Sequence, residues 1–219
     1  MSWAYSGDPE AISEVSRWPC HERRGQDEVQ IPTQVDLNTK RWGYLVPNDT
    51  NPIRWFKLLL LNPEDAKEDV KKSKFLNDVR AKLQDYIGYE SDGIIDIVAD
   101  FLKELWNHAL KEINREIDID VLPFRVAITI PAIWPQYARV KMKEAAVKAG
   151  IMEPRPIGDT TIILVEEPEA AALSILYERR EYPEVGVSIL ARYCPASNIH
   201  RGPSWVTLNY KDLTLCWKC

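Results

Sequence analysis

Hydrophobic positions in the middle of the chain recur with the period of an amphipathic helix. Between residues 92 and 117, three- and four-residue spacings predict one long helix that Ser91 or Asp92 can cap. The face that this helix would bury carries Ile94, Val98, Phe101, Leu102, Leu105, Ala109 and Ile113. Upstream, the charged stretch over 66–87 predicts one or two further helices, and Pro63 suits a first helical position.

The flanking segments have a different pattern. The first 60 residues predict short strands and turns, and residues 207–215 predict a weak strand. The expected early strands cover 3–5, 11–15, 30–35 and 41–46.

After Pro123 the pattern becomes that of a crossover unit. Residues 124–130 (FRVAITI) are β-branched and largely apolar, which predicts a buried strand, and a helix over 135–149 follows with a face of small residues. A second buried strand over 160–165 leads into a helix from 169 to about 180, with Pro168 suited to its first position. The order strand–helix–strand–helix predicts an α/β fold with parallel strands.

Ligands of such folds lie at the carboxyl ends of the strands. Pro131 stands at one of these ends, and the pair Glu166 and Glu167 stands at the other. We therefore take these positions as the first candidates for a site.

Composition and charge narrow the choice of partners. The 219 residues are 45% hydrophobic and 28% charged, which is enough for a real core in one large domain or two small ones. A net charge of −5 gives no global attraction to nucleic acid or to an anionic membrane. The longest apolar run, over 55–61, is interrupted by Lys57 and is too short to span a bilayer. We expect neither a nucleic-acid nor a membrane partner.

The cysteines and residues 1–10 indicate the cellular location of the protein. Residues 1–10 have no apolar stretch, so they do not predict a secretory signal. Three of the four cysteines lie in the last 26 residues and do not form a disulfide framework. Both observations favour a cytoplasmic protein.

Several residues could carry chemistry, and each has a structural alternative. No glycine-rich nucleotide motif and no His-Glu-x-x-His motif is present. Cys216 and Cys219 form a Cys-x-x-Cys motif that could be a redox pair or, with Cys194 and His200, a zinc site; a simple tail is the favoured interpretation.

Glu166, Glu167 and Lys57 have structural alternatives of the same kind. The two glutamates could hold a hydrated metal or complement a helix dipole, and Lys57 could bind an anion or keep its ammonium in water beside an apolar segment. The pattern alone favours the structural interpretation of all three.

Two segments together resemble the 70-kilodalton heat-shock protein family. The first comprises residues 128–132 (ITIPA), Arg139 and residues 143–150 (KEAAVKAG), and it resembles the family's "V-P-A … R … A-G" strand and helix. The second is 165–173 (VEEPEAAAL), which resembles "N-E-P-T-A-A-A". Trp134 and the glutamate at 166 in place of asparagine look more like the heat-shock-70-like relatives of fungi and animals than like a housekeeping chaperone. Residues 42–44 and 51–58 agree more weakly.

The resemblance implies an actin-like ATPase (ribonuclease H-like) lobe over residues 1–186, with a mixed sheet flanked by helices and a helical insertion subdomain. In that family ATP and Mg²⁺ lie between two lobes, and a lysine and a glutamate of the first lobe place the attacking water and the hydrated metal. These residues match Lys57 and Glu167, with Glu167 reaching Mg²⁺ through water. The family's proline and arginine that couple nucleotide state to the substrate domain match Pro131 and Arg139.

Parts of the family pattern are missing. The first strand with its "D-x-G-T-T" loop does not occur, and no "D-x-G-G-G-T" loop follows Glu184. We expect residues 187–219 to be a divergent, poorly ordered tail of a chain that is cut short, or read in another frame or through an intron. Without both phosphate loops, we expect a truncated nucleotide-binding lobe with impaired ATP binding and hydrolysis. The alternative is a non-enzymatic module that binds a protein or itself through an exposed lobe edge, or a non-functional fragment.

Overall fold

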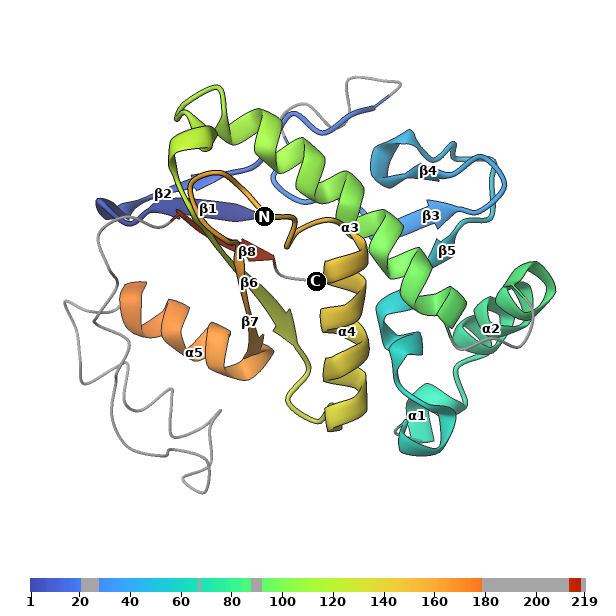
Figure 1. Ribbon diagram of the computed structural model, residues 1–219. Helices are drawn as coiled ribbons and strands as arrows, with labels where there is room; N and C mark the ends of the chain where they lie inside the picture. Colours follow the sequence, from blue (N-terminus) through green and yellow to red (C-terminus); the bar gives the residue numbers. More distant parts are fainter. Residues whose placement is uncertain (21–27, 67, 88–91, 179–212, 218–219) are drawn as a thin grey trace.

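The computed structural model describes residues 1–20, 28–66, 68–87, 92–178 and 213–217 (Figure 1). Its strands are β1 (Ser2–Tyr5), β2 (Asp8–Glu14), β3 (Gln34–Asp36), β4 (Arg41–Trp42), β5 (Ile53–Arg54), β6 (Phe124–Ile130), β7 (Thr161–Glu166) and β8 (Leu213–Trp217). Its α-helices are α1 (Glu68–Lys71), α2 (Lys74–Ile87), α3 (Asp92–Ile113), α4 (Gln136–Lys148) and α5 (Glu167–Glu178). Short 3₁₀ turns cover Gly43–Leu45, Phe56–Leu60, Pro63–Asp65 and Ile119–Val121. None of the helices in these ranges is both long and apolar enough to cross a membrane.

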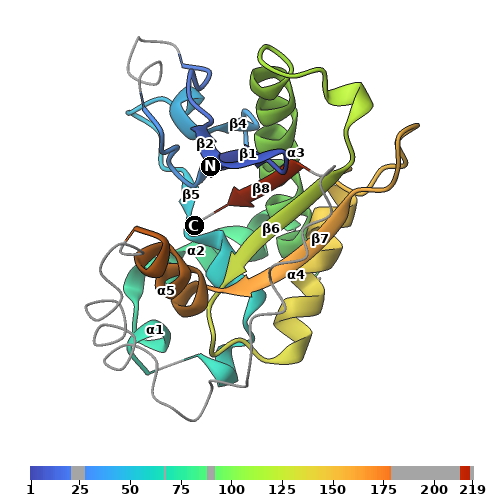
Figure 2. The same cartoon turned by 90° about the vertical axis from the view of Figure 1, so that its left-hand side faces the viewer.

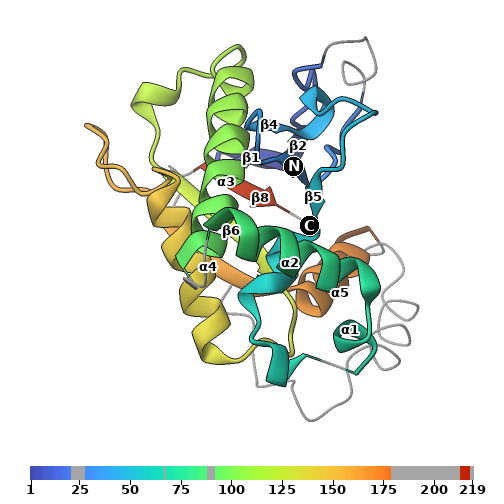
Figure 3. The same cartoon turned by 90° about the vertical axis from the view of Figure 1, so that its right-hand side faces the viewer.

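The predicted crossover unit is confirmed. Strands β6 and β7 are parallel, in a register that runs from the pair Arg125–Thr161 to the pair Ile130–Glu166. Helix α4 connects them and packs with α3 on one face of the sheet, while α5 lies on the opposite face (Figures 2 and 3). The carboxyl ends of β6 and β7 therefore lie side by side, as the sequence pattern requires.

The larger sheet is mixed, with the strand order β2-β1-β8-β6-β7. Strand β1 is antiparallel to both of its neighbours, β2 and β8. Strand β6 is parallel to both of its neighbours, β8 and β7. A second, three-stranded sheet has the order β4-β3-β5. This mixed α/β architecture is compatible with the lobe that the family resemblance implies.

Strand β8 comes from the segment expected to be a divergent tail. Residues 213–217 lie between β1 and β6 and pair with both, so they fill the middle of the larger sheet. This part of the tail is regular, and it is shifted from the weak strand expected over 207–215. Residues 187–212 and 218–219 lie outside the described residues, so the expectation for them stays a prediction.

Several other boundaries differ from those predicted. The expected strand over 41–46 is reduced to β4, because Gly43 adopts φ +55° and starts a 3₁₀ turn directly after Trp42. In place of the strand expected over 30–35, β3 covers Gln34–Asp36. Helix α3 ends at Ile113 rather than at 117, since the chain then turns through hydrogen bonds from the amides of Arg115 and Glu116 to the carbonyls three residues before them. Helix α5 begins at Glu167, which places Pro168 at its second position.

Aromatic side chains join the long helix to the rest of the core. Phe101 of α3 contacts Phe56 and Trp42 edge-to-face, with ring centroids 5.3 Å and 5.9 Å apart. One turn further along, Trp106 meets Phe124 of β6 in the same way, at 5.3 Å. Helix α3 is thus fixed both to the large sheet and to the 3₁₀ turn Phe56–Leu60.

We expect Phe101→Ala to lower the free energy of unfolding by about 3–5 kcal/mol, because it leaves a cavity between α3, Phe56 and Trp42. Urea denaturation measures this change. The exposed Lys103→Ala on the same helix is the control, with an expected change within about 0.5 kcal/mol. A Phe101→Ala variant as stable as the control would show that this cluster does not hold α3.

Candidate functional site

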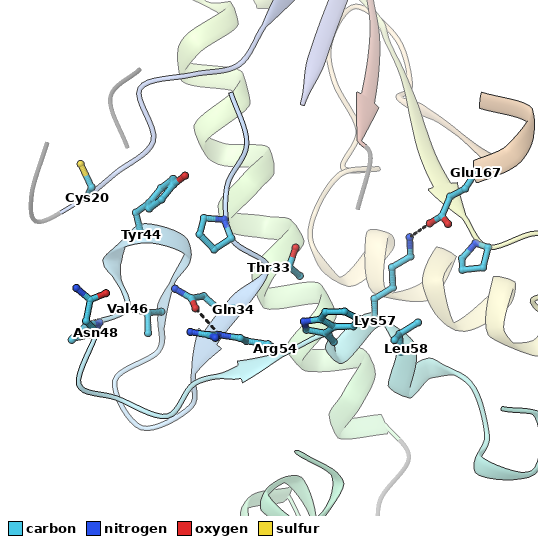
Figure 4. Close-up of a pocket in the computed structure, with 14 residues that line it drawn as sticks. Cys20, Thr33, Gln34, Tyr44, Val46, Asn48, Arg54, Lys57, Leu58 and Glu167 are labelled. Atoms are coloured by element: carbon cyan, nitrogen blue, oxygen red, sulfur yellow. Dashed lines mark hydrogen bonds and ion pairs between the residues drawn. The ribbon is translucent and has the colours of Figure 1, made fainter. Parts of the chain in front are cut away.

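A cleft of about 950 Å³ opens between the three-stranded sheet and the carboxyl ends of β6 and β7 (Figure 4). Three of the four predicted site residues, Lys57, Pro131 and Glu167, line this cleft. The other lining residues are Cys20, Pro32, Thr33, Gln34, Tyr44, Val46, Pro47, Asn48, Arg54, Trp55 and Leu58. The fold therefore brings Lys57, Pro131 and Glu167 together from three separate segments of the chain.

Lys57 is buried, with 6% of its surface exposed. Its Nζ donates hydrogen bonds to the carbonyl oxygen of Thr129 at 2.7 Å and to Glu167 Oε1 at 3.3 Å. It also lies 5.6 Å from the ring centroid of Trp134, within the range of a cation–π contact. The interpretation of Lys57 as a surface lysine with its ammonium in water is therefore wrong. The turn Phe56–Leu60 directs the ammonium inward, because Phe56, Leu59 and Leu60 are themselves buried.

Glu166 and Glu167 point to different partners. Glu166 is the last residue of β7, and its Oε1 lies 2.7 Å from Arg139 Nη2. Glu167 is the first residue of α5 and pairs with Lys57 instead. Adjacent side chains at a strand end leave opposite faces of the sheet, which explains the divergence. Because Glu167 also lies at a helix N-terminus, it complements the helix dipole as well, so the two interpretations of this carboxylate are compatible.

Arg139 holds the connection between β6 and α4. Its Nε donates to the carbonyl oxygen of Trp134 at 3.1 Å, and its Nη2 reaches the carbonyl oxygen of Ala132 at 3.4 Å in addition to Glu166. Arg139 does not line the cleft, but the loop that it grips begins at Pro131, which does. The predicted pair Pro131 and Arg139 thus belongs to one locally connected unit.

The opposite wall of the cleft contains residues to which the sequence analysis gave no role. Arg54 Nε donates to Gln34 Oε1 at 3.0 Å, and Gln34 Nε2 donates to the carbonyl oxygen of Gly43 at 2.9 Å. The hydroxyl of Tyr44 donates to the carbonyl oxygen of Gln30, and burial, followed by the negative charge of Glu28, raises the pKa of Tyr44 above its usual value. The signal for this wall was present in the weakly matching segments 42–44 and 51–58.

The potential metal ligands are few. No cluster of three or more His, Cys, Asp or Glu residues suited to a metal ion occurs in the described part of the chain. Glu167, with 37% of its side chain exposed, is suited to a contact with a metal through water. In the predicted thiol or zinc site, Cys216 lies in β8, while Cys194, His200 and Cys219 lie outside the described residues. That hypothesis stays a prediction.

Tyr137 ties the first turn of α4 to the segment after Lys57. Its hydroxyl accepts a hydrogen bond from the amide of Asn62 at 2.9 Å and donates one to Asp65 Oδ2 at 2.6 Å. Burial, followed by the hydrogen bond to Asp65, raises the pKa of Tyr137 above its usual value of 10.0. The 3₁₀ turn Pro63–Asp65 is thereby anchored to the helix that carries Arg139.

Known proteins with similar sequences are heat shock 70 kDa proteins. Heat shock 70 kDa protein 12A of the mouse is 28% identical over 185 residues, and human heat shock 70 kDa protein 12B is 27% identical over 187 residues. Each match covers 78% of this chain. This weak similarity supports a divergent member of a heat-shock-70-like family. The chain spans about a quarter of the length of the curated relatives it matches. No protein-family model and no solved structure matches it.

We expect Arg139→Lys to lower the free energy of unfolding by about 1–2 kcal/mol, since one ammonium cannot replace the guanidinium at two backbone carbonyls and the Glu166 carboxylate. Chemical denaturation gives the value, with the exposed Lys143→Ala of the same helix as the control. Equal stability of both variants would contradict the role of Arg139 as a clamp.

Tyr137 gives a pH-dependent prediction. Because the folded state holds the Tyr137 proton above pH 10.0, where the unfolded chain releases it, stability is present below that pH and is lost as pH rises through the raised pKa. We expect Tyr137→Phe to cost about 1 kcal/mol at neutral pH and to flatten the decline of the unfolding free energy above about pH 10. Parallel pH profiles of the variant and the wild-type protein would contradict this.

Proposed function

We propose that the cleft binds ATP with Mg²⁺ and that the terminal phosphate lies at Lys57 Nζ. One observation carries this proposal: a buried ammonium is fixed between the Thr129 carbonyl oxygen, at 2.7 Å, and Glu167 Oε1, at 3.3 Å, beside a cleft of about 950 Å³. The position at the carboxyl ends of two parallel strands is where α/β folds bind ligands. The similarity to heat shock 70 kDa proteins supports the same ligand.

The two side chains have complementary roles in this proposal. Lys57 supplies a positive charge that is already oriented before the reaction, and such a charge stabilises the negative charge that develops on a transferring phosphoryl group. Glu167 accepts a hydrogen bond from a water molecule and orients it towards the phosphate. Mg²⁺, when bound, neutralises phosphate charge, and it needs few protein ligands because phosphate oxygens and water complete its coordination. The single, partly exposed carboxylate of Glu167 fits that requirement.

The same cleft has few of the backbone donors that phosphate sites normally use. None of its lining residues, as far as the structure describes them, is a glycine, so a glycine-rich loop of amide groups is missing from this set. We therefore propose that this chain alone binds ATP weakly and hydrolyses it slowly. We propose that this lobe contributes Lys57 and Glu167 and that further phosphate contacts come from another lobe or chain.

We propose that Pro131 and Arg139 transmit ligand binding in the cleft to helix α4. Pro131 lines the cleft, and Arg139 binds the loop that starts there to Glu166, the neighbour of Glu167. A ligand that draws Lys57 away from Glu167 breaks their ion pair and leaves the Arg139–Glu166 ion pair beside it at the end of β7. We propose that the change reaches α4 through Arg139.

Thermal unfolding with and without MgATP tests the binding proposal. A ligand present at about one hundred times its Kd adds about 2.7 kcal/mol and raises Tm by several degrees. We expect this shift in the wild-type chain and in Lys143→Ala, and its loss in Lys57→Met, which keeps a long side chain without the charge. We expect Glu167→Gln to retain the shift and to lose any measurable ATP turnover.

A cooperative transition that MgATP does not move would overturn the proposal. In that case the cleft would not serve nucleotide binding. A concentration-dependent Tm without a nucleotide effect would then favour the module that associates with itself.

A further inference from the structure

A second pocket lies in the part of the molecule formed by the three-stranded sheet and helix α2, on the side where Figure 1 shows both. Its volume is about 560 Å³, and it shares no lining residue with the cleft. Along β5, Ile53 lines this pocket, whereas the next residue, Arg54, lines the cleft. The proposed nucleotide site therefore does not account for it. The residues that line the pocket are Asp36, Leu37, Asn38, Thr50, Asn51, Ile53 and Lys82.

Asp36 brings a carboxylate that is largely removed from water to this pocket. It is 8% exposed at the end of β3, and both hydrogen bonds that it accepts come from its own turn. The amide of Asn38 donates to Oδ1 at 3.1 Å, and the hydroxyl of Thr39 donates to Oδ2 at 2.8 Å. Within the described ranges, no ion pair joins Asp36 to a cation. Because a buried carboxylate is stabilised by a hydrogen-bonded cation, this wall of the pocket favours a ligand with a positive group.

Lys82 of α2 brings the opposite charge to the same pocket. Its Nζ donates to the carbonyl oxygen of Asn51 at 3.4 Å, a long contact that leaves the ammonium further donors for a ligand. Lys82 would repel a ligand that carried only a positive charge, and Asp36 would repel a ligand that carried only a negative charge. The two side chains together therefore suit a small molecule with one charge of each sign.

The rest of the lining adds polar and apolar contacts. The side-chain amides of Asn38 and Asn51 are both donors and acceptors, so they can assist at either charged group. Leu37 and Ile53 add apolar surface. A ligand whose two charges are joined by one carbon atom that also carries an apolar side chain uses all of these features.

We propose that this pocket binds a free α-amino acid with an apolar side chain, with its ammonium group at Asp36 and its carboxylate at Lys82. A pocket of about 560 Å³ leaves room for water beside a molecule of this size. The pocket therefore recognises the two charges more strictly than the side chain, and leucine, methionine and valine should bind within a fewfold of one another. This inference does not depend on the proposed nucleotide site.

Ligands that differ by one charge test the assignment. Isothermal titration calorimetry on the full chain measures the Kd of L-leucine, of N-acetyl-L-leucine, which lacks the ammonium group, and of L-leucinamide, which lacks the carboxylate. We expect L-leucine to bind, and each analogue to bind at least about 10-fold more weakly, because each leaves one charged side chain of the pocket without its partner.

Substitutions of the two charged residues test the same contacts from the side of the protein. Asp36→Asn keeps a side-chain oxygen for the turn, and Lys82→Met keeps a long side chain, so both variants should fold, which thermal unfolding checks. We expect each variant to bind L-leucine about 10- to 100-fold more weakly. Asp78→Asn and Lys74→Met are matched controls, because both residues are exposed on α2 and do not line the pocket; the Kd should be unchanged.

Three results would overturn the proposal. The first is that L-leucine does not bind the wild-type chain. The second is that either analogue binds as tightly as L-leucine, since the pocket would then not recognise both charges. The third is that D-glucose binds in place of L-leucine and is lost in Asp36→Asn, which would make the pocket a polyol site. The Tm shift with MgATP is a separate measurement: it should be the same in Asp36→Asn and Lys82→Met as in the wild-type chain, so failure of the amino-acid site leaves the nucleotide proposal standing.

Discussion

The contact between Phe56 and Phe101 determines where the buried Lys57 can lie. Phe56 is inserted edge-on against a ring of the long helix α3, and its neighbour Lys57 is carried with it towards the end of β6. An ammonium is flexible on its own four-carbon stem, so an accurate position requires a rigid backbone below it. The edge-to-face packing supplies this rigidity, and the Thr129 carbonyl oxygen and Glu167 then fix the charge.

Two adjacent glutamates at the end of β7, Glu166 and Glu167, have different partners. Glu167 faces Lys57 and the cleft, whereas Glu166 faces Arg139 and the loop from Pro131 to Trp134. Adjacent residues that alternate across a strand end can therefore hold the proposed chemistry on one side and a connection to α4 on the other. Two ion pairs, one residue apart in sequence, link the cleft to a helix that does not line it.

The hydrophobic pattern was sufficient to predict elements whose structure is determined within one segment of the chain. The β-branched run of β6, the small-residue face of α4 and the acidic start of α5 are enough to predict the crossover unit without any tertiary contact. The pattern did not predict features that depend on contacts with residues distant in the sequence. The burial of Lys57 depends on α3 and β6, and the early end of β4 depends on the conformation of Gly43. Strand β8 depends on two pairing partners more than 80 residues before it. The family resemblance placed Lys57 and Glu167 in one site but did not indicate that they pair with each other. The exposure of Trp55 had no signal in the hydrophobic pattern, which favours core for a tryptophan.

A crystal structure of the chain with a non-hydrolysable MgATP analogue tests the central claim most directly. We predict that the terminal phosphate lies within hydrogen-bond distance of Lys57 Nζ, on the side of the cleft that Glu167 lines. An analogue bound with its phosphates elsewhere, and with the contacts of Lys57 to Thr129 and Glu167 unchanged, would contradict it.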